Sequence, residues 1–323
     1  MLRRDLFSMA AAPLAFAACT KKRGPLEKIR VTAGPYFSMG SLYVALESGY
    51  FEREGLSVET RQISASNQAI PLIAGGQIDV GFMSASASLM NAVLKGALIR
   101  IVAGREIASP TCGDAMSLYV FRKSFPDGFS DLKKLKGKRV ATHTKGAVSD
   151  FAMDLILGQA GLSRNDIEEV SLTQSESVAA LLSGKVDAVI GSFHPVLTAA
   201  THARLIARAT GASAIYPNFQ YSHILFGSRL LQGDPGRGKA FLRAYLQGAR
   251  EFLQGKTPKY LAEYAQSMNV ELSQIQGACR DSFTPDGRIQ TEDLQRLVDW
   301  AIKKEYTSGV TVEQLVDRRF LPS

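Results

Sequence analysis

The amino-acid sequence predicts an α/β fold of two Rossmann-like lobes, joined by a hinge of two chain crossings, with a helical C-terminal tail on the first lobe. Short strands alternate with helices along the first two-thirds of the chain, which is typical of βα units. One segment, 73–84, returns 108 positions later as 181–192. From residue 234 onward the pattern is helical. Together these observations predict two similar lobes.

The repeated segment predicts the same local structure in both lobes. Each copy contains the apolar end of a helix, a glycine, a polar residue, Ile or Val, an aspartate, a short apolar run and a serine. The glycine tolerates the left-handed conformation that ends a helix, and the apolar run predicts a buried strand. The strand ends at Ser84 in one copy and at Ser192 in the other. Because open α/β sheets bind ligands at the carboxyl ends of their strands, the repeat predicts two serines that face one cleft.

The remaining elements follow from apolar periodicity and from glycine or proline boundaries. In the first lobe we expect strands at 28–34, 57–63 and 99–103 and helices at 41–48, 67–74 and 87–95. A strand at 116–122 leads into the second lobe, which is predicted to have further strands at 139–142, 166–172 and 204–207 and helices at 131–138, 147–161, 176–182 and 195–203. A strand at 221–226 follows, and tail helices are predicted at 236–253, 258–267, 272–282, 291–305 and 312–316.

The alternation also predicts where the lobes begin and end. We expect crossings near Leu118–Tyr119 and near Gln220–Tyr221, where the pattern starts afresh. The first lobe then comprises 28–119 and 221–323, and the second lobe is an insertion at 120–220.

The N-terminus has the features of an export signal. Residues 1–18 carry Arg3-Arg4, which resemble a twin-arginine signal, followed by a short apolar run that ends in small residues. Cys19 stands where a bacterial lipoprotein is lipidated, so we expect a lipid anchor and a tether at 19–27. Phe16 departs from the lipoprotein pattern, and Ala15-Phe16-Ala17 would also suit ordinary signal peptidase, so ordinary signal cleavage stays open. No apolar run reaches the ~18–20 residues that a membrane span needs.

The charge pattern does not indicate nucleic-acid binding. The net charge is +8, and removal of residues 1–18 takes away two arginines and one aspartate, which leaves 8 − 1 = +7. The basic runs at 21–23 and 133–139 lack the interleaved aromatic residues of a single-strand groove. We interpret them as solvated faces.

Several other motifs carry little chemistry. Cys112 and Cys279 could form a disulfide after export, but the sequence does not place them together, and two separate buried thiols are the favoured interpretation. The four histidines have no metal-ligand spacing, so no metal is expected. Residues 233–240 imitate a phosphate-binding loop but carry Ala240 where Ser or Thr would hold Mg²⁺. Asp234-Pro235 therefore predict a helix start.

At this point the chain resembles the periplasmic solute-binding proteins of ABC importers, in the branch for nitrate, taurine, aliphatic sulfonates and thiamine-pyrimidine precursors. The matching segments span nearly all of the mature chain and are 42–56, 76–81, 131–141, 182–188 and 313–321. The resemblance implies the type II periplasmic-binding-protein fold, no catalysis, no cofactor and a permease as partner. It also implies a monomer in the periplasm.

Candidate ligand-binding residues lie in loops that follow strands and precede helices, where free N–H groups favour anions. They are Tyr36, Phe37, Ser38, Ser66, Ser84, Ser86, His143, Lys145, Ser149, Ser192 and His194, with Asp114 and Tyr221 beside the crossings. Each serine could equally serve only as a helix cap. In sulfonate-binding relatives the residue after Gly146 is usually Ser or Thr, and Ala147 here weakens a sulfonate or nitrate assignment.

The sequence therefore predicts a receptor that captures a small polar or anionic organic solute and delivers it to a membrane permease. The alternative is an enzyme on the same fold that resembles the pyrimidine synthases, but their cysteine-rich motif is absent. A regulatory sensor is a further alternative, and only a tether precedes the first strand.

Overall fold

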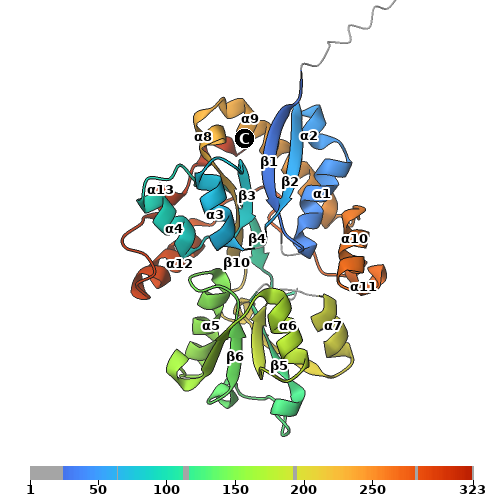
Figure 1. The fold of residues 1–323 in the computed structure, drawn as a ribbon, viewed down its shortest axis with the longest axis vertical. Coiled ribbons are helices and arrows are strands. Elements are labelled where there is room, and N and C mark those ends of the chain that lie inside the picture. Colours follow the sequence, from blue (N-terminus) through green and yellow to red (C-terminus); the bar gives the residue numbers. More distant parts are fainter. Residues whose placement is uncertain (1–24, 64, 112–115, 192–194, 281–282, 322–323) are drawn as a thin grey trace, which may run out of the picture.

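A computed structural model of the chain describes residues 25–63, 65–111, 116–191, 195–280 and 283–321. Two α/β lobes lie one above the other, each built around a five-stranded sheet (Figure 1). The predicted two-lobed α/β fold is confirmed. None of the described helices combines the length and the apolar character that crossing a membrane requires.

The two sheets have the same design. In the first sheet the order is β2-β1-β3-β10-β4, and in the second it is β7-β6-β8-β5-β9. The strands of the first sheet are β1 (Glu27–Ala33), β2 (Leu56–Gln62), β3 (Val80–Met83), β4 (Arg100–Ala108) and β10 (Phe219–Phe226). Those of the second are β5 (Ser117–Phe121), β6 (Arg139–Thr142), β7 (Glu168–Ser171), β8 (Ala188–Gly191) and β9 (Ile206–Gly211). In each sheet the strand that follows a crossing, β10 or β5, runs antiparallel to both of its neighbours.

The crossings lie slightly earlier in the chain than the sequence predicted. The first falls between Ala108 and Ser117, because 117–119 pair with β8 and β9 and so belong to the second lobe. The second ends at Phe219, which already pairs with Ala108 of β4. The strand pairing thus places the crossings about two residues before the predicted boundaries at 119 and 220. A strand buried on both faces has the same apolar pattern in either lobe, so periodicity could not place them.

The repeated segment builds the same hydrogen-bonded clamp in both lobes. Gly76 and Gly184 have φ values of 67° and 72°, as expected for glycines that end helices. Asp79 accepts hydrogen bonds from the backbone N, Nε and Nη2 of Arg30 at 2.8–3.0 Å. Asp187 accepts the equivalent bonds from Arg139 at 2.9–3.1 Å. The repeated aspartate thus ties the first parallel strand of each lobe to the loop before the third.

Helices cover both faces of each sheet. Those of the first lobe are α1 (Gly40–Glu47), α2 (Tyr50–Arg53), α3 (Ser66–Ala74), α4 (Ala87–Leu94) and α8 (Ser228–Gln232). Those of the second are α5 (Val148–Gln159), α6 (Gln174–Leu182) and α7 (Pro195–His202). The tail helices are α9 (Pro235–Leu253), α10 (Tyr260–Ser267), α11 (Leu272–Gln276), α12 (Thr291–Lys303) and α13 (Val312–Leu315).

The C-terminal tail packs on the first lobe, as predicted. Helix α9 lies along α1, and its Phe241 packs against Phe51 and Phe226 at ring-centroid distances of 5.1 and 5.9 Å. Helix α9 begins with Asp234 as cap, whose Oδ1 accepts a hydrogen bond from the backbone N of Gly236 at 2.9 Å. The segment that imitates a phosphate-binding loop is therefore the start of a helix, as the sequence analysis predicted.

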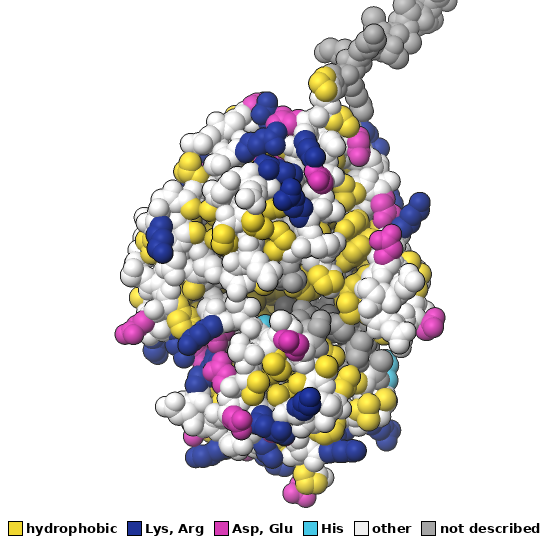
Figure 2. Space-filling view, in the orientation of Figure 1, with side chains coloured by type: hydrophobic (Ala, Val, Ile, Leu, Met, Phe, Trp, Pro, Cys, Tyr) yellow, Lys and Arg dark blue, Asp and Glu magenta, His cyan; other side chains and the backbone are white. Residues whose placement is uncertain are grey.

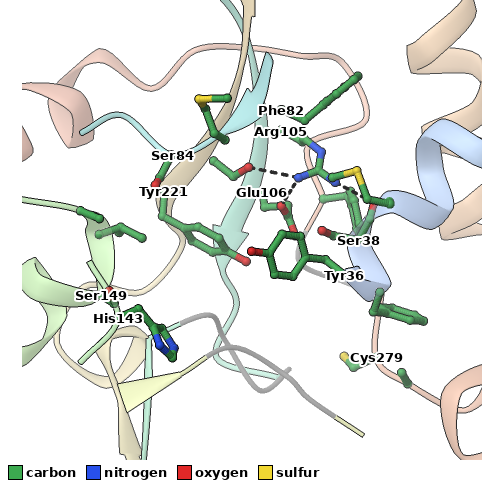
Figure 3. A pocket seen from close by; sticks show the side chains of 18 of the residues that line it. Tyr36, Ser38, Phe82, Ser84, Arg105, Glu106, His143, Ser149, Tyr221 and Cys279 are labelled. Carbon is green, nitrogen blue, oxygen red and sulfur yellow. Dashed lines mark hydrogen bonds and ion pairs between the residues drawn. The ribbon is translucent and has the colours of Figure 1, made fainter. Parts of the chain in front are cut away.

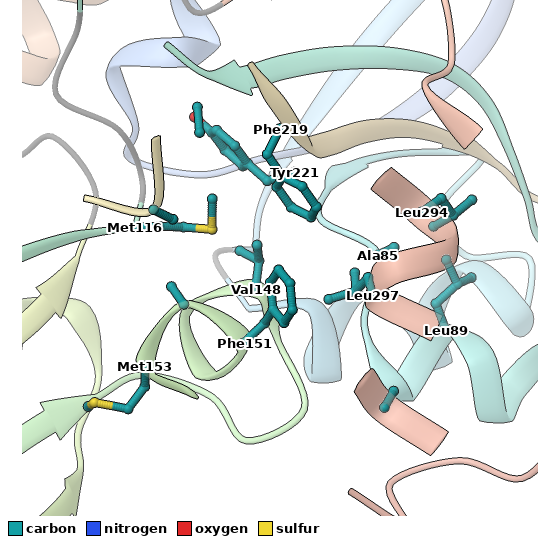
Figure 4. Close-up of a cluster of buried hydrophobic side chains, with 14 of the residues drawn as sticks. Ala85, Leu89, Met116, Val148, Phe151, Met153, Phe219, Tyr221, Leu294 and Leu297 are labelled. Carbon is teal, nitrogen blue, oxygen red and sulfur yellow. The ribbon is translucent and has the colours of Figure 1, made fainter. Parts of the chain in front are cut away.

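Besides the two crossings, the lobes share a hydrophobic contact. Val148 and Phe151 of α5, in the second lobe, belong to one buried cluster with Leu294 and Leu297 of α12, in the first (Figure 4). Phe219, at the second crossing, lies 5.4 Å from Phe151 between ring centroids. The tail helix α12 thus supports one side of the second lobe.

Polar contacts extend this interface. The Asp154 carboxylate on α5 accepts a hydrogen bond from Trp300 Nε1 at 2.8 Å and pairs with Lys304 Nζ at 2.9 Å. Burial alone would raise the pKa of Asp154, but these groups and Arg164 outweigh burial and lower it. The backbone N of Ala87 also donates to the carbonyl of Gly146 at 2.9 Å, from the first lobe to the second.

We predict that Asp154→Ala loosens the lobes without unfolding them. The substitution removes the acceptor of Trp300 and the partner of Lys304, at a cost of about 1–2 kcal/mol to the contact between lobes. Small-angle X-ray scattering should show a larger radius of gyration. Asp299→Ala is the matched control, because Asp299 is exposed on α12, the helix of Trp300, and bonds only within that helix. Equal radii for the two variants would contradict the role of Asp154.

Candidate functional site

A cavity of about 530 Å³ lies where the two lobes meet. The outline of the molecule narrows between the two lobes (Figure 2). The first lobe contributes residues that follow β1, β2 and β3, together with part of β4, β10 and the tail. The second lobe contributes the loop after β6, the start of α5 and residues of α7. A cavity of this size holds a small organic molecule.

Most of the sequence-predicted residues line this cavity. They are Tyr36, Phe37, Ser38, Ser66, Ser84, His143, Ser149 and Tyr221. Tyr36, Ser84 and Tyr221 come from the first lobe, and His143 and Ser149 face them from the second (Figure 3). The structure thus brings together loops that lie more than a hundred residues apart in the sequence.

Two predicted residues lie elsewhere. Ser86 caps α4, and its Oγ accepts a hydrogen bond from the backbone N of Leu89 at 3.4 Å. Lys145 is exposed, with Nζ 5.7 Å from the ring centroid of Tyr306. Neither residue lines the cavity, unlike the sequence prediction. Asp114, Ser192 and His194 lie outside the described residues.

Arg105 and Glu106, the only charged pair in the described cavity wall, are not among the residues predicted from the sequence. The predicted strand ended at 103, because Gly104 and two adjacent charges resemble a loop. Strand β4 instead continues to Ala108, because the two charges pair with each other and stay buried. An Arg-Glu pair followed by Ile107-Ala108 was the signal that could have revealed it.

The guanidinium of Arg105 is held almost entirely by the protein. Nε donates to the Tyr245 hydroxyl at 3.1 Å, and Nη2 donates to the carbonyl of Ser38 at 2.7 Å. Nη1 donates to Glu106 Oε2 at 2.5 Å and to Ser222 Oγ at 3.3 Å. Burial alone would lower the pKa of Arg105, but Glu106 and Tyr245 outweigh burial and raise it. Arg105 is therefore a fixed positive charge inside the wall.

Aromatic side chains form much of the remaining wall. Tyr36, Phe82, Tyr221 and Phe283 line the cavity, and Tyr36 and Tyr221 direct their rings into it (Figure 3). The Arg105 guanidinium lies 5.5 Å from the ring centroid of Phe82 and 5.9 Å from that of Phe283. Aromatic walls with a few polar groups are suited to a planar organic ligand.

His143 is a polar group that the second lobe contributes to the cavity wall. Neither ring nitrogen makes a hydrogen bond with a described residue, although both are buried. Burial lowers the pKa of His143, and the nearby backbone of Leu172 offsets only part of this effect. At neutral pH the ring is therefore uncharged and offers one donor and one acceptor.

A second histidine is buried next to the cavity. His223 lies on β10, two residues after Tyr221, and neither of its ring nitrogens has a hydrogen-bond partner among the described residues. Burial lowers its pKa to about 4.

Because the pKa of His223 is lowered on folding, we predict that the free energy of unfolding depends on pH. Between its ordinary pKa of 6.5 and its folded pKa of about 4, the unfolded chain binds the proton more readily. Stability therefore falls as the pH falls through this window, by about 3 kcal/mol relative to neutral pH. Urea titrations between pH 7 and pH 4 should show this loss, and His223→Leu should remove most of it. An unchanged pH profile in the variant would contradict the assignment.

The structure also bears on the cysteines and on metal-ligating side chains. Cys279, on the cavity wall, is disulfide-bonded, so the favoured interpretation of two separate thiols is wrong. The other two cysteines lie outside the described residues. No cluster of metal-ligating side chains occurs within the described ranges.

Two α/β lobes around one cleft are the generic fold of the periplasmic binding proteins, and this chain has that fold. The aliphatic sulphonate-binding protein SsuA from Escherichia coli superposes with a TM-score of 0.72 at 19% identity, over 92% of this chain and 94% of its own. The desulfurization enzyme DSZB has the same fold, with a TM-score of 0.64 at 14% identity, over 91% of this chain and 97% of its own.

The sequence comparison then gives the family. The NMT1/THI5-like family model matches residues 37–256, and the chain belongs to this family. A protein of Brucella abortus, provisionally named a binding protein, is 22% identical over 277 residues, which are 85% of this chain and 81% of that protein.

Proposed function

We propose that the protein is the solute-binding component of an ABC-type importer, which captures a small organic solute between its lobes and delivers it to a membrane permease. The observation that carries this proposal is the cavity wall, to which both lobes contribute. A ligand that contacts both walls stabilises the closed arrangement, which a permease can then recognise.

The proposed ligand contacts come from both lobes. Tyr36 and Tyr221 offer rings for stacking, and Ser38, Ser66 and Ser84 offer polar groups from the first lobe. His143 and Ser149 offer polar groups from the second. The chain is proposed to act in the periplasm as a monomer, after export by the N-terminal signal and lipidation of Cys19. No catalysis and no cofactor are part of this proposal.

Identification of the bound solute tests the proposal. We expect the mature chain to bind one solute molecule per chain, as measured by native mass spectrometry and calorimetry. At a ligand concentration 100 times the dissociation constant, binding stabilises the fold by about 2.7 kcal/mol. Tyr221→Ala and His143→Ala should weaken binding, whereas Gln295→Ala, on the exposed face of α12, should not.

The alternative is an enzyme on the same fold. The structural similarity to a desulfurization enzyme supports this alternative. The two functions differ in the fate of the ligand. A receptor returns the solute unchanged after denaturation, whereas an enzyme converts it. Chemical conversion of the bound solute during incubation would overturn the receptor proposal.

A further inference from the structure

The end of the first lobe that lies away from the cavity carries a cluster of basic side chains. Figure 2 shows Lys and Arg gathered at this end, where Figure 1 places α8 and the start of β1. We call this cluster the outer basic surface. Its members are Lys28 of β1, Arg229 of α8, Arg237, Lys239 and Arg243 of α9, and Arg318 and Arg319 after α13.

Ion pairs and hydrogen bonds join these cations around Glu27, the first residue of β1. The Glu27 carboxylate pairs with Arg229 Nη2 at 3.2 Å and with Arg237 Nε at 2.6 Å. Arg319 Nη2 donates to the carbonyl of Leu231, within α8, at 3.5 Å. Residues from four separate segments of the chain therefore form one continuous surface.

The acidic side chains of this surface lie deeper than the basic ones. The Glu54 side chain is 29% exposed and its partner Arg243 is 49% exposed. The difference is larger for Asp317 and Arg319, at 13% against 61%. Glu27 is likewise less exposed than both of its arginine partners. The carboxylates thus hold the guanidinium groups in place from below, and the outermost layer is positively charged.

Three of the cations keep donors for a further partner. Lys239 and Arg318 are exposed, and neither makes an ion pair with a carboxylate of the described residues. Arg237 pairs with Glu27 through Nε, and its two Nη groups make no hydrogen bond to a described residue. Ammonium and guanidinium groups bind phosphate oxygens through charge-assisted hydrogen bonds. The outer basic surface can therefore bind several phosphate groups at once.

Two features of the chain beside this surface favour a lipid bilayer as its partner. Leu26, directly before β1, is a large apolar side chain that is 41% exposed, and an apolar side chain among cations suits the interface of a bilayer. The sequence also has Lys21-Lys22-Arg23 just before it. Only four residues separate Arg23 from Glu27, so their Cα atoms are at most about 14 Å apart.

We infer that the outer basic surface lies against an anionic lipid bilayer, where Arg237, Lys239 and Arg318 bind the phosphate groups of the lipid headgroups. The inference goes beyond the proposed function, because β1 separates this surface from Tyr36 and the cavity. The cations are exposed, so salt weakens the contact and the chain can leave the bilayer again.

Vesicle binding by the mature chain without an attached lipid tests the inference. Co-sedimentation should show binding to vesicles of phosphatidylcholine that contain phosphatidylglycerol, and much weaker binding to phosphatidylcholine alone. High salt should release the chain. The variant Arg237→Gln/Lys239→Gln/Arg318→Gln should bind the anionic vesicles about 10–100-fold more weakly, because it removes three cations from the bilayer surface.

The matched control is Lys123→Gln/Lys133→Gln/Lys185→Gln, which removes three exposed cations from the second lobe. Its vesicle binding should be nearly unchanged, and both variants should keep the urea midpoint of the unmodified chain. An equal loss in both variants would mean that net charge alone drives binding, and would overturn the inference. Release from the vesicles by inorganic phosphate at matched ionic strength would overturn it in favour of a site for a single anion.

Two further results separate this inference from neighbouring explanations. Vesicle binding that is lost on replacement of Lys21-Lys22-Arg23 by glutamines, but not in the Arg237 variant, would place the contact outside the folded surface and overturn the inference. Calorimetry of solute binding provides the readout for the proposed function. A chain that binds its solute but not anionic vesicles would overturn the inference alone and leave the proposed function standing.

Discussion

Replacement of Glu106 by leucine is expected to lower the free energy of unfolding by about 3–5 kcal/mol, because a buried charge is left without its partner. Arg105 is 3% exposed, and only Glu106 compensates its charge within the described cavity wall. Urea or guanidinium titrations at neutral pH measure the effect. The loss should persist at high salt, since solvent ions do not reach the pair.

The double variant Arg105→Met/Glu106→Leu is the matched control. It removes both charges and replaces them with apolar groups of similar size, so much of the lost stability should return. Tyr245 then loses a donor, but its hydroxyl keeps a contact with Ser41 Oγ at 3.1 Å. If the double variant is as unstable as Glu106→Leu, the unpaired charge is not the cause.

Asp79→Ala should destabilise the first lobe by about 2–3 kcal/mol, since it removes one side of a largely buried pair and frees two guanidinium groups. The Asp79 side chain is fully buried, and it accepts from Arg30 and from Arg229. Hydrogen exchange measured by mass spectrometry should show faster exchange in β1 and β3 than in the second lobe.

Asp187→Ala makes the equivalent change in the second lobe and serves as the internal comparison. We expect a smaller effect, because Arg139 is more exposed than Arg30, at 38% against 24% of the side chain. Faster exchange should now appear in β6 and β8. Exchange that rises equally in both lobes for either variant would contradict separate clamps.

The ion pair of Asp187 with Arg139 also determines how the stability of the second lobe depends on acid pH. Burial would raise the pKa of Asp187, but Arg139 and Ser124 outweigh burial and lower it to about 2. The stabilisation is present above the ordinary pKa of 3.8 and is lost as the pH falls toward 2. This window lies below that of His223, so the two effects are separable.

The sequence predicted the fold well because the fold is repeated. Gly76 and Gly184 end helices, and Asp79 and Asp187 directly precede equivalent strands, so one segment that occurs twice defines both lobes. The crossings were harder to place. Residues 117–119 are buried between two neighbouring strands in the second sheet, and local periodicity does not record which sheet a strand joins.

The candidate site was predicted where local rules apply and missed where distant contacts decide. Loops after strands contain Tyr36, Ser84 and His143, and strand order alone brings them to the cavity. Arg105 and Glu106 stay inside a strand only because Tyr245, from α9, and the carbonyl of Ser38 complete their hydrogen bonds. Ile107 and Ala108 after the pair indicate a longer strand, but no pattern within residues 100–108 indicates that the two charges are buried.

A crystal structure of the mature chain with its co-purified solute tests the central claim most directly. The account predicts one solute molecule between the lobes, in contact with Tyr36 and Glu106 on one side and with His143 or Ser149 on the other. A solute bound to a single lobe, or on the outer surface with the cavity empty, would contradict it.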